Sequence, residues 1–99
     1  MSLTSQHRKQ LRALGHQLKP VVIVAGNGLS ESVQAEIGRA LLDHELIKIK
    51  LAVEDRVERA ALIDAVCQHH GAEAVQSIGK VALLYKESLQ PKPTSNLPR

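Results

Sequence analysis

Hydrophobic and polar positions along the first quarter of the chain follow two different patterns. Across residues 4–18, apolar side chains recur at spacings of three and four, which predicts an amphipathic helix with Thr4 or Ser5 as its N-cap. Residues 21–25 are apolar at consecutive positions and largely β-branched, a pattern that favours a central strand covered on both faces. We therefore expect helices on both sides of this strand, with Pro20 ending the first helix before it.

A glycine-containing segment follows and leads into a second periodic stretch. Gly26, Asn27 and Gly28 break the apolar run, and Ser30 is placed to cap a helix. The apolar side chains of that helix form one stripe: Val33, Ile37, Ala40 and Leu41. This part of the chain is therefore predicted to be a strand, a loop and a helix in direct succession.

The middle of the chain predicts a second strand and a third helix. Residues 46–53 alternate, so one face of the strand is aliphatic and the other carries Lys48 and Lys50. Asp55 predicts the start of the third helix and Gly71 its end. The inner stripe of this helix is predicted to be Ala61, Leu62, Ala65 and Val66.

The last part of the chain divides into a hairpin and a tail. Residues 74–78 and 81–85 are short apolar runs that flank Gly79 and Lys80, which predicts a closing hairpin. Residues 87–99 contain three of the four prolines and no periodicity, so we expect a flexible basic tail.

Composition narrows the class of protein. A chain of 99 residues has room for one domain, and its 43% hydrophobic and 23% charged residues are typical of a soluble globular one. Tyr85 is the only aromatic residue, which leaves almost no side chain on which an unpaired base could stack. The single Cys67 cannot form an intramolecular disulfide, and no apolar run approaches the roughly 18 residues of a membrane span. We therefore expect a cytoplasmic protein.

The net charge of +3 is mildly basic, and its distribution is more informative than its size. Residues 1–20 carry four cations and no acid, whereas residues 31–45 carry four acids and only Arg39. Residues 54–73 are again acidic. Basic and acidic blocks therefore alternate along the chain.

The loop over residues 25–28 precedes a helix, where unpaired N–H groups and the positive end of the helix dipole can receive a phosphate. The alternative is that the glycines and Asn27 only supply positive φ angles for a tight turn. No Walker lysine follows, and Glu31 stands where a dinucleotide fingerprint would have its third glycine. A nucleotide cofactor is therefore disfavoured, while a polyanion held by several weak contacts remains compatible.

Lys48 and Lys50 are predicted to project to the same side of their strand, and Lys80 in the hairpin turn can join them in one basic patch. The alternative is that these lysines keep a solvated strand from aggregating. The basic first helix favours the patch. If the protein contacts about four single-stranded phosphates, raising the salt concentration from about 50 to about 200 mM should weaken binding roughly 50-fold.

Other chemistry finds little support in the residue pattern. Cys67 and His70 could share a helix face, but one pair without a second pair at ligand spacing does not make a metal site. Residues 43–45, Asp-His-Glu, offer acid and base side chains but have no nucleophile beside them, and no serine has the context of a nucleophile elbow. We therefore expect no metal, no other cofactor and no catalysis.

Five blocks of sequence carry a more specific signal: LKPVVIV at 18–24, NGLSE at 27–31, ELIKIK at 45–50, IGK at 78–80 and LY at 84–85. In order and spacing they resemble the CRM-domain family, in particular stand-alone bacterial YhbY-type RNA-binding proteins. The resemblance runs from about residue 3 to residue 86 and extends to the terminal residues 97–99.

The resemblance implies a single small α/β domain over residues 1–86. Its order would be α-β-α-β-α-β-β, with helices packed on a four-stranded mixed sheet, similar to the C-terminal domain of bacterial translation initiation factor three. It also implies association with precursors of the large ribosomal subunit and RNA binding through a G-x-x-G-type loop with the neighbouring basic surface. By position that loop is residues 25–28, so Ala25 replaces the usual first glycine and Gly28 is the matched one.

The hypothesis from the sequence is therefore a ribosome assembly factor that binds rRNA in pre-50S particles. It is expected to be a cytoplasmic monomer with no membrane or DNA partner. The RNA-contacting residues are predicted to be Lys19, Gly26, Asn27, Gly28, Ser30, Lys48, Lys50, Lys80 and Arg12, with Arg8 and Lys9 as secondary candidates. Two alternatives stay open: a protein-interaction adaptor that uses the acidic helices or the tail, and a protein that binds a small phosphorylated ligand.

Overall fold

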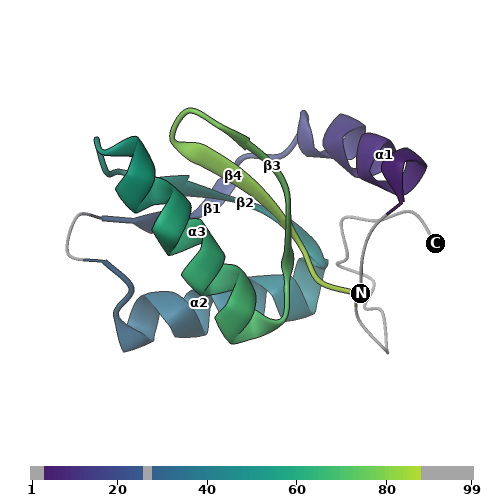
Figure 1. Cartoon of the computed structure of the whole chain (residues 1–99). Helices are drawn as coiled ribbons and strands as arrows, with labels where there is room; N and C mark the ends of the chain where they lie inside the picture. The colour runs from purple at the N-terminus through teal and green to yellow at the C-terminus, as the bar shows by residue number, and fades with distance from the viewer. Residues whose placement is uncertain (1–3, 26–27, 88–99) are drawn as a thin grey trace.

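The computed structural model describes residues 4–25 and 28–87, and Figure 1 shows how its elements are arranged. Their order is the one predicted: α1 (Ser5–Gly15), β1 (Pro20–Val24), α2 (Glu31–His44), β2 (Leu46–Leu51), α3 (Arg56–His70), β3 (Glu73–Ile78) and β4 (Val81–Tyr85). Apart from residue 87, the predicted tail lies outside the described residues. Within the described ranges, no helix is both long enough and apolar enough to cross a membrane.

The four strands form one mixed sheet in the order β1-β2-β4-β3. β1 and β2 are parallel, whereas β4 is antiparallel to both β2 and β3, so the predicted α/β class is confirmed. The central, doubly covered position predicted for β1 is wrong. It is an edge strand in which Val22 and Val24 are buried while Val21 and Ile23 are exposed, because none of the three described helices covers the outer face at this edge.

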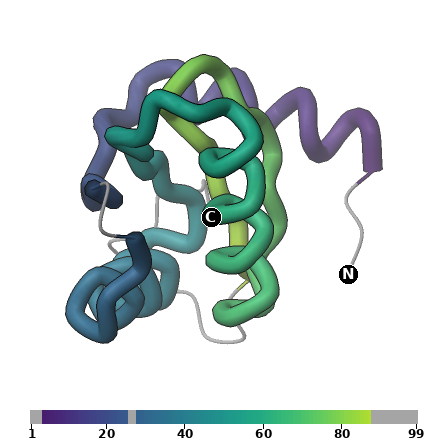
Figure 2. The backbone as a smooth tube through the Cα atoms, turned by 60° about the vertical axis from the view of Figure 1, so that its left-hand side comes forward, coloured from purple at the N-terminus to yellow at the C-terminus, as the bar shows by residue number. Residues whose placement is uncertain are grey.

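The main core lies between the sheet and helices α2 and α3, which share one face of it (Figure 2). Both helices begin where predicted: Ser30 Oγ accepts a hydrogen bond from Val33 N, and Asp55 Oδ1 accepts one from Val57 N. α3 ends at Gly71, which takes a left-handed φ of +66°. The strands contribute Val22, Val24, Ile47, Ile49, Leu51, Ala82 and Leu84 to this core.

The inner side of α3 matches the predicted stripe only in part, at Val66, which is buried, and at Leu62, which packs against the core. Ile63 and Val66 are buried, whereas Ala61 and Ala65 are exposed. Apolar residues occur around much of this helix, and even Val57 is 77% exposed. The pattern therefore does not determine which side faces the sheet, because an exposed alanine loses little burial free energy.

Helix α1 packs on the opposite face of the sheet, so helices lie on both sides of the sheet, although not on both sides of β1 as predicted (Figure 1). Leu11 of α1 belongs to a second buried cluster with Leu46, Val75, Leu83 and Tyr85. Gly15 lies directly over Leu83, since a Cβ added to Gly15 would fall 2.5 Å from Leu83 Cδ2. The missing side chain lets the end of α1 approach the sheet closely.

Arg8 fastens α1 to β3. Its Nη1 donates to the carbonyl oxygens of Ala74 at 3.0 Å and Val75 at 3.3 Å, and its Nη2 lies 3.7 Å from Glu73 Oε2. These contacts fall where the pairing of β3 with β4 shifts register, between Ala74 and Gln76. α1 therefore covers the end of the sheet formed by the start of β2 and the end of β4, and leaves the other half of this face uncovered.

Candidate functional site

The loop that joins β1 to α2 closes as a tight turn. Gly26 and Asn27 lie outside the described residues, but Gly28 N donates a hydrogen bond to Ala25 O at 3.0 Å across them. Gly28 has a φ of +87°, and a Cβ placed there would meet nothing within 4 Å. The turn therefore uses the backbone freedom of glycine at this position and leaves open space beside it.

The start of α2 follows this turn directly. Ser30 is exposed and caps the helix, and Glu31 places an acid in its first turn. Because Glu31 offsets part of the positive potential at the helix start, the dipole alone would hold an anion weakly. A polyanion at this end of the molecule needs further cations close by.

Backbone hydrogen bonds gather three segments at this end of the sheet (Figure 1). Ala52 N donates to Val24 O at 2.8 Å, so the end of β2 lies beside the start of the loop. Leu51 N donates to Lys80 O at 2.6 Å, which brings the turn between β3 and β4 to the same place. Lys50, next to Leu51, is exposed. We call this region, with Gly28, Lys50 and Lys80, the loop end of the sheet.

Lys80 is engaged by an acid. Its Nζ lies 2.5 Å from Oε1 of Glu54, in the segment between β2 and α3. The hydrogen bond from Lys80 and then its positive charge lower the pKa of Glu54. The Glu54 side chain is 91% exposed, so this pair is open to water and to competing anions.

Lys48 and Lys50 project from the face of β2 opposite the main core, as predicted. Ile47, Ile49 and Leu51 alternate with them and are buried. Lys50 is exposed, whereas Lys48 is half-buried. Both lysines therefore belong to the sheet face that α1 covers only in part.

The remaining predicted cations lie toward α1. Lys19 is exposed and precedes Pro20, which pairs with Lys48. Arg12 is half-buried in the last turn of α1. The structure thus brings Gly28, Lys50 and Lys80 together at one end of the sheet, with Ser30 following at the start of α2, and leaves Arg12, Lys19 and Lys48 nearer the other end. Arg8, a secondary candidate, is held by β3.

A hollow of about 240 Å³ lies where the end of α1 meets the uncovered half of the sheet. It is lined by His16, Lys48, Gln76, Ile78, Val81 and Leu83. Of these residues, only Lys48 belongs to the RNA-contacting set predicted from the sequence. The apolar run of β4 is visible in the sequence, but the register that places Leu83 opposite Lys48 is not.

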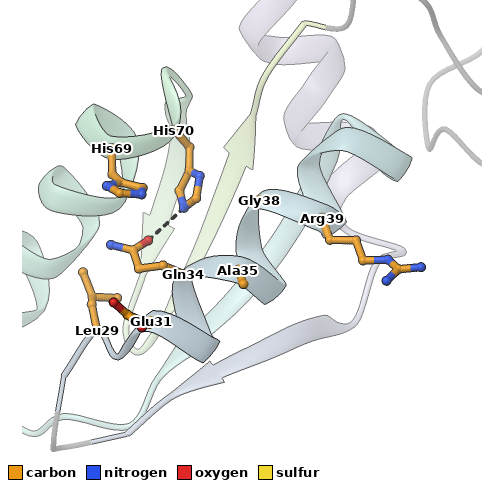
Figure 3. Close-up of a pocket in the computed structure, with 8 residues that line it drawn as sticks. All are labelled: Leu29, Glu31, Gln34, Ala35, Gly38, Arg39, His69 and His70. Carbon is orange, nitrogen blue, oxygen red and sulfur yellow. Dashed lines mark hydrogen bonds between the residues drawn. The ribbon is translucent and has the colours of Figure 1, made fainter.

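A second hollow separates α2 from the C-terminal end of α3 (Figure 3). It is lined by Leu29, Glu31, Gln34, Ala35, Gly38, Arg39, His69 and His70. His70 Nε2 donates to Gln34 Oε1 at 2.8 Å and so bridges the two helices. Burial lowers the pKa of His70, with the charges of His69 and Lys86 as smaller causes. Arg39 and Glu31, which both line this hollow, carry opposite charges, so the hollow offers little net positive charge to a polyanion.

Cys67 and the histidines, considered above for a metal site, do not form a ligand cluster within the described residues. In residues 4–25 and 28–87, no three His, Cys, Asp or Glu side chains come together so that they could hold a metal ion. Burial raises the pKa of the half-buried Cys67 thiol, and the negative charges of Asp64 and Glu73 raise it further. A thiol that stays protonated is a poor nucleophile and a poor ligand.

Comparison with known proteins points to one family. The model of the CRS1 / YhbY (CRM) domain matches residues 3–86. A probable RNA-binding protein of Pseudomonas aeruginosa is 55% identical over 97 residues, which cover 98% of this chain and 91% of that protein. An RNA-binding protein of Haemophilus influenzae is 43% identical over 91 residues, which cover 92% of each chain.

The fold gives the same result. The chain is similar to a Staphylococcus aureus protein whose solution structure is described as that of a candidate RNA-binding protein. The TM-score is 0.80 at 27% identity, with 94% of this chain and 97% of that chain covered. The family match spans every element from α1 to β4. The chain therefore belongs to the CRS1 / YhbY (CRM) domain family, as the resemblance in its sequence predicted.

Proposed function

We propose that this chain is an RNA-binding protein that acts in assembly of the large ribosomal subunit by associating with rRNA in precursor particles, without catalysis of its own. Membership of the CRM family and the names of the Pseudomonas and Haemophilus relatives support RNA binding. The resemblance to YhbY-type proteins supports the role in precursor particles. In this chain, the proposal depends above all on the loop end of the sheet, where backbone hydrogen bonds bring Gly28, Lys50 and Lys80 together.

The proposed contact begins at the loop. Backbone N–H groups around Gly28 and at the start of α2 receive one phosphate, and the lysines of the same face neutralise its neighbours along the RNA. Positions further along the sheet extend the contact toward α1. The full proposed set is Arg12, Lys19, Gly26, Asn27, Gly28, Ser30, Lys48, Lys50 and Lys80.

The first test is the salt dependence of binding to a purified rRNA fragment. Each phosphate contact contributes about 0.7 to the slope by which log affinity falls with log salt concentration. With four such contacts, raising the salt concentration from about 50 to about 200 mM should weaken binding roughly 50-fold. Fluorescence anisotropy titrations across this range measure that change directly. An association constant that stayed the same at all salt concentrations would rule out the electrostatic mechanism.

The second test is sedimentation of cell extract through a gradient at low salt, where the protein is expected in fractions of precursor large subunits. Lys48→Glu with Lys50→Glu should remove it from these fractions. The matched control is Arg39→Glu with Arg56→Glu, which reverses the same amount of charge at exposed positions of α2 and α3 and should leave association intact. Loss with the control pair alone would favour a protein-interaction adaptor that uses these two helices.

A further inference from the structure

The half of the sheet that α1 leaves uncovered presents aliphatic side chains together with lysines. The strand register aligns one row across all four strands: Ile23 on β1, Lys50 on β2, Val81 on β4 and Ile78 on β3. Since neighbouring strands lie about 4.8 Å apart, the row spans roughly 14 Å. This row and its neighbours Val21, Lys48 and Gln76 are called the open sheet face below.

The exposed aliphatic side chains of this face are clustered. Five large hydrophobic residues in the described part of the chain are strongly exposed, and three of them lie here: Val21 at 49%, Ile23 at 61% and Ile78 at 65%. Single exposed aliphatic residues are normal on any protein surface. A group of them around charged residues is instead typical of an interaction surface.

The charge of the open sheet face restricts what can cover it. Lys50 lies in the first row, and Lys48 lies in a second row opposite Leu83, which is itself opposite Gln76. Among the described residues of these two rows there is no acid. A second copy of this chain would place lysine against lysine, so the partner must carry negative charge and also offer an apolar surface.

Nucleic acid meets both requirements. The scarcity of aromatic side chains in this chain then distinguishes single-stranded from double-helical nucleic acid as the partner. Unpaired bases are usually held by stacking on aromatic rings. Tyr85, the only aromatic residue, is 5% exposed and packs in the cluster beneath α1. The open sheet face therefore suits RNA whose bases are already stacked on one another. The wide, shallow minor groove of an A-form helix offers sugar edges between two rims of phosphate.

We propose that the open sheet face docks double-helical RNA through its minor groove, with Ile23 and Ile78 against the sugar edges and Lys48 and Lys50 on phosphates. This rests on the proposed function and extends it by naming the class of RNA. Lys50 belongs both to this face and to the loop end of the sheet. One duplex can therefore contact the open sheet face and the loop without a break.

The experiment compares two RNAs with the full-length protein: a hairpin with a stem of about 16 base pairs and a single strand with the same number of phosphates. Wild-type protein is expected to bind the hairpin more tightly. Ile23→Thr with Ile78→Thr keeps the charge and the β-branched shape, and should weaken hairpin binding about tenfold through lost apolar contact. The slope of affinity against salt should not change, because no phosphate contact is lost.

The matched control removes two other exposed aliphatic side chains, Leu42 at 56% and Val57 at 77% exposure, which lie on α2 and α3. Leu42→Thr with Val57→Thr should leave hairpin affinity unchanged. Circular dichroism melts of both double variants show whether each is folded at the assay temperature. If a double variant is not folded, the two single Thr variants are tested in its place.

Four results decide the question. Equal wild-type affinity for hairpin and single strand, or a loss of less than about twofold in the Ile23 and Ile78 variant, overturns duplex docking. If the Ile23 and Ile78 variant keeps its affinity for the hairpin but no longer sediments with precursor particles, the open sheet face binds a protein instead. Wild-type protein that binds neither RNA would refute the proposed function itself, and so separates that failure from a failure of the open sheet face.

Discussion

The Nζ atom of Lys80 lies 2.5 Å from Oε1 of Glu54, so an acid from the segment before α3 holds a cation at the loop end of the sheet. Exposed pairs of this kind contribute little to stability. Their effect on binding is larger, because Glu54 and an RNA phosphate compete for the same ammonium group. Glu54 is therefore expected to restrain RNA affinity.

Glu54→Gln should raise RNA affinity about threefold at low salt and less at higher salt, where the removed charge is already screened. Anisotropy titrations at two salt concentrations measure the gain. Glu36→Gln, at an exposed position of α2, makes the same change in net charge and should leave affinity near that of wild type. Equal gains in both variants would indicate a general charge effect and not competition for Lys80.

Gly28→Ala should destabilise the turn before α2. The new side chain would have to adopt a φ of +87°, where nothing clashes with it, so the cost of about 1 to 2 kcal/mol in the free energy of unfolding comes from the backbone alone. Gly28→Asn should lose less, because asparagine tolerates positive φ better than alanine. Urea denaturation compares the three proteins, and an Ala variant as stable as wild type would contradict a requirement for glycine.

Gly15→Ala should destabilise the packing of α1 on the sheet. Its Cβ would fall 2.5 Å from Leu83 Cδ2, on a side chain that is only 2% exposed. Overpacking costs about 1 to 3 kcal/mol, which exceeds the roughly 1 kcal/mol that alanine gains over glycine in a helix.

A double-mutant cycle with Leu83→Ala tests this contact. The shorter side chain makes room for the new methyl group, so the two changes together should cost less than the sum of their separate costs in urea denaturation. Strict additivity would show that Gly15 and Leu83 do not interact.

Stability should fall in mildly acidic solution because burial lowers the pKa of His70 from 6.5. As the pH drops through about 6.5, the unfolded chain takes up a proton at this histidine while the folded protein still resists it, so protonation favours unfolding. The urea midpoint should therefore be lower near about pH 5.5 than near about pH 7.5, and less so in His70→Gln. A dependence unchanged in His70→Gln would assign it to other groups.

Local signals explain why the order of elements could be predicted. Ser30 and Asp55 cap the helices that follow them, and Gly71 ends α3 in a left-handed conformation. The place of β1 at the edge of the sheet could not be predicted in the same way. Consecutive apolar residues predict a strand, but they do not predict its place in the sheet, where β1 pairs with β2 and with no other described strand.

The candidate site likewise has features that the local sequence predicts and others that depend on tertiary structure. Alternation with Ile47 and Ile49 correctly predicts that Lys48 and Lys50 share one face. Glu54, the acid beside Lys80, lies 26 residues away in sequence, and no local sequence pattern predicts their contact. The row from Ile23 to Ile78 depends on three strand registers at once, which are set by tertiary packing and not by the composition of any one strand.

The guanidinium of Arg8 has a consequence for how this protein behaves at high concentration. β3 is an edge strand, and Arg8 occupies the carbonyl groups of Ala74 and Val75 on it. A strand from another molecule needs free carbonyl groups along an edge to extend the sheet. Because Arg8 of α1 occupies these two acceptors, β3 is a poor template for such addition, and copies of this protein at high concentration are less prone to join through this edge.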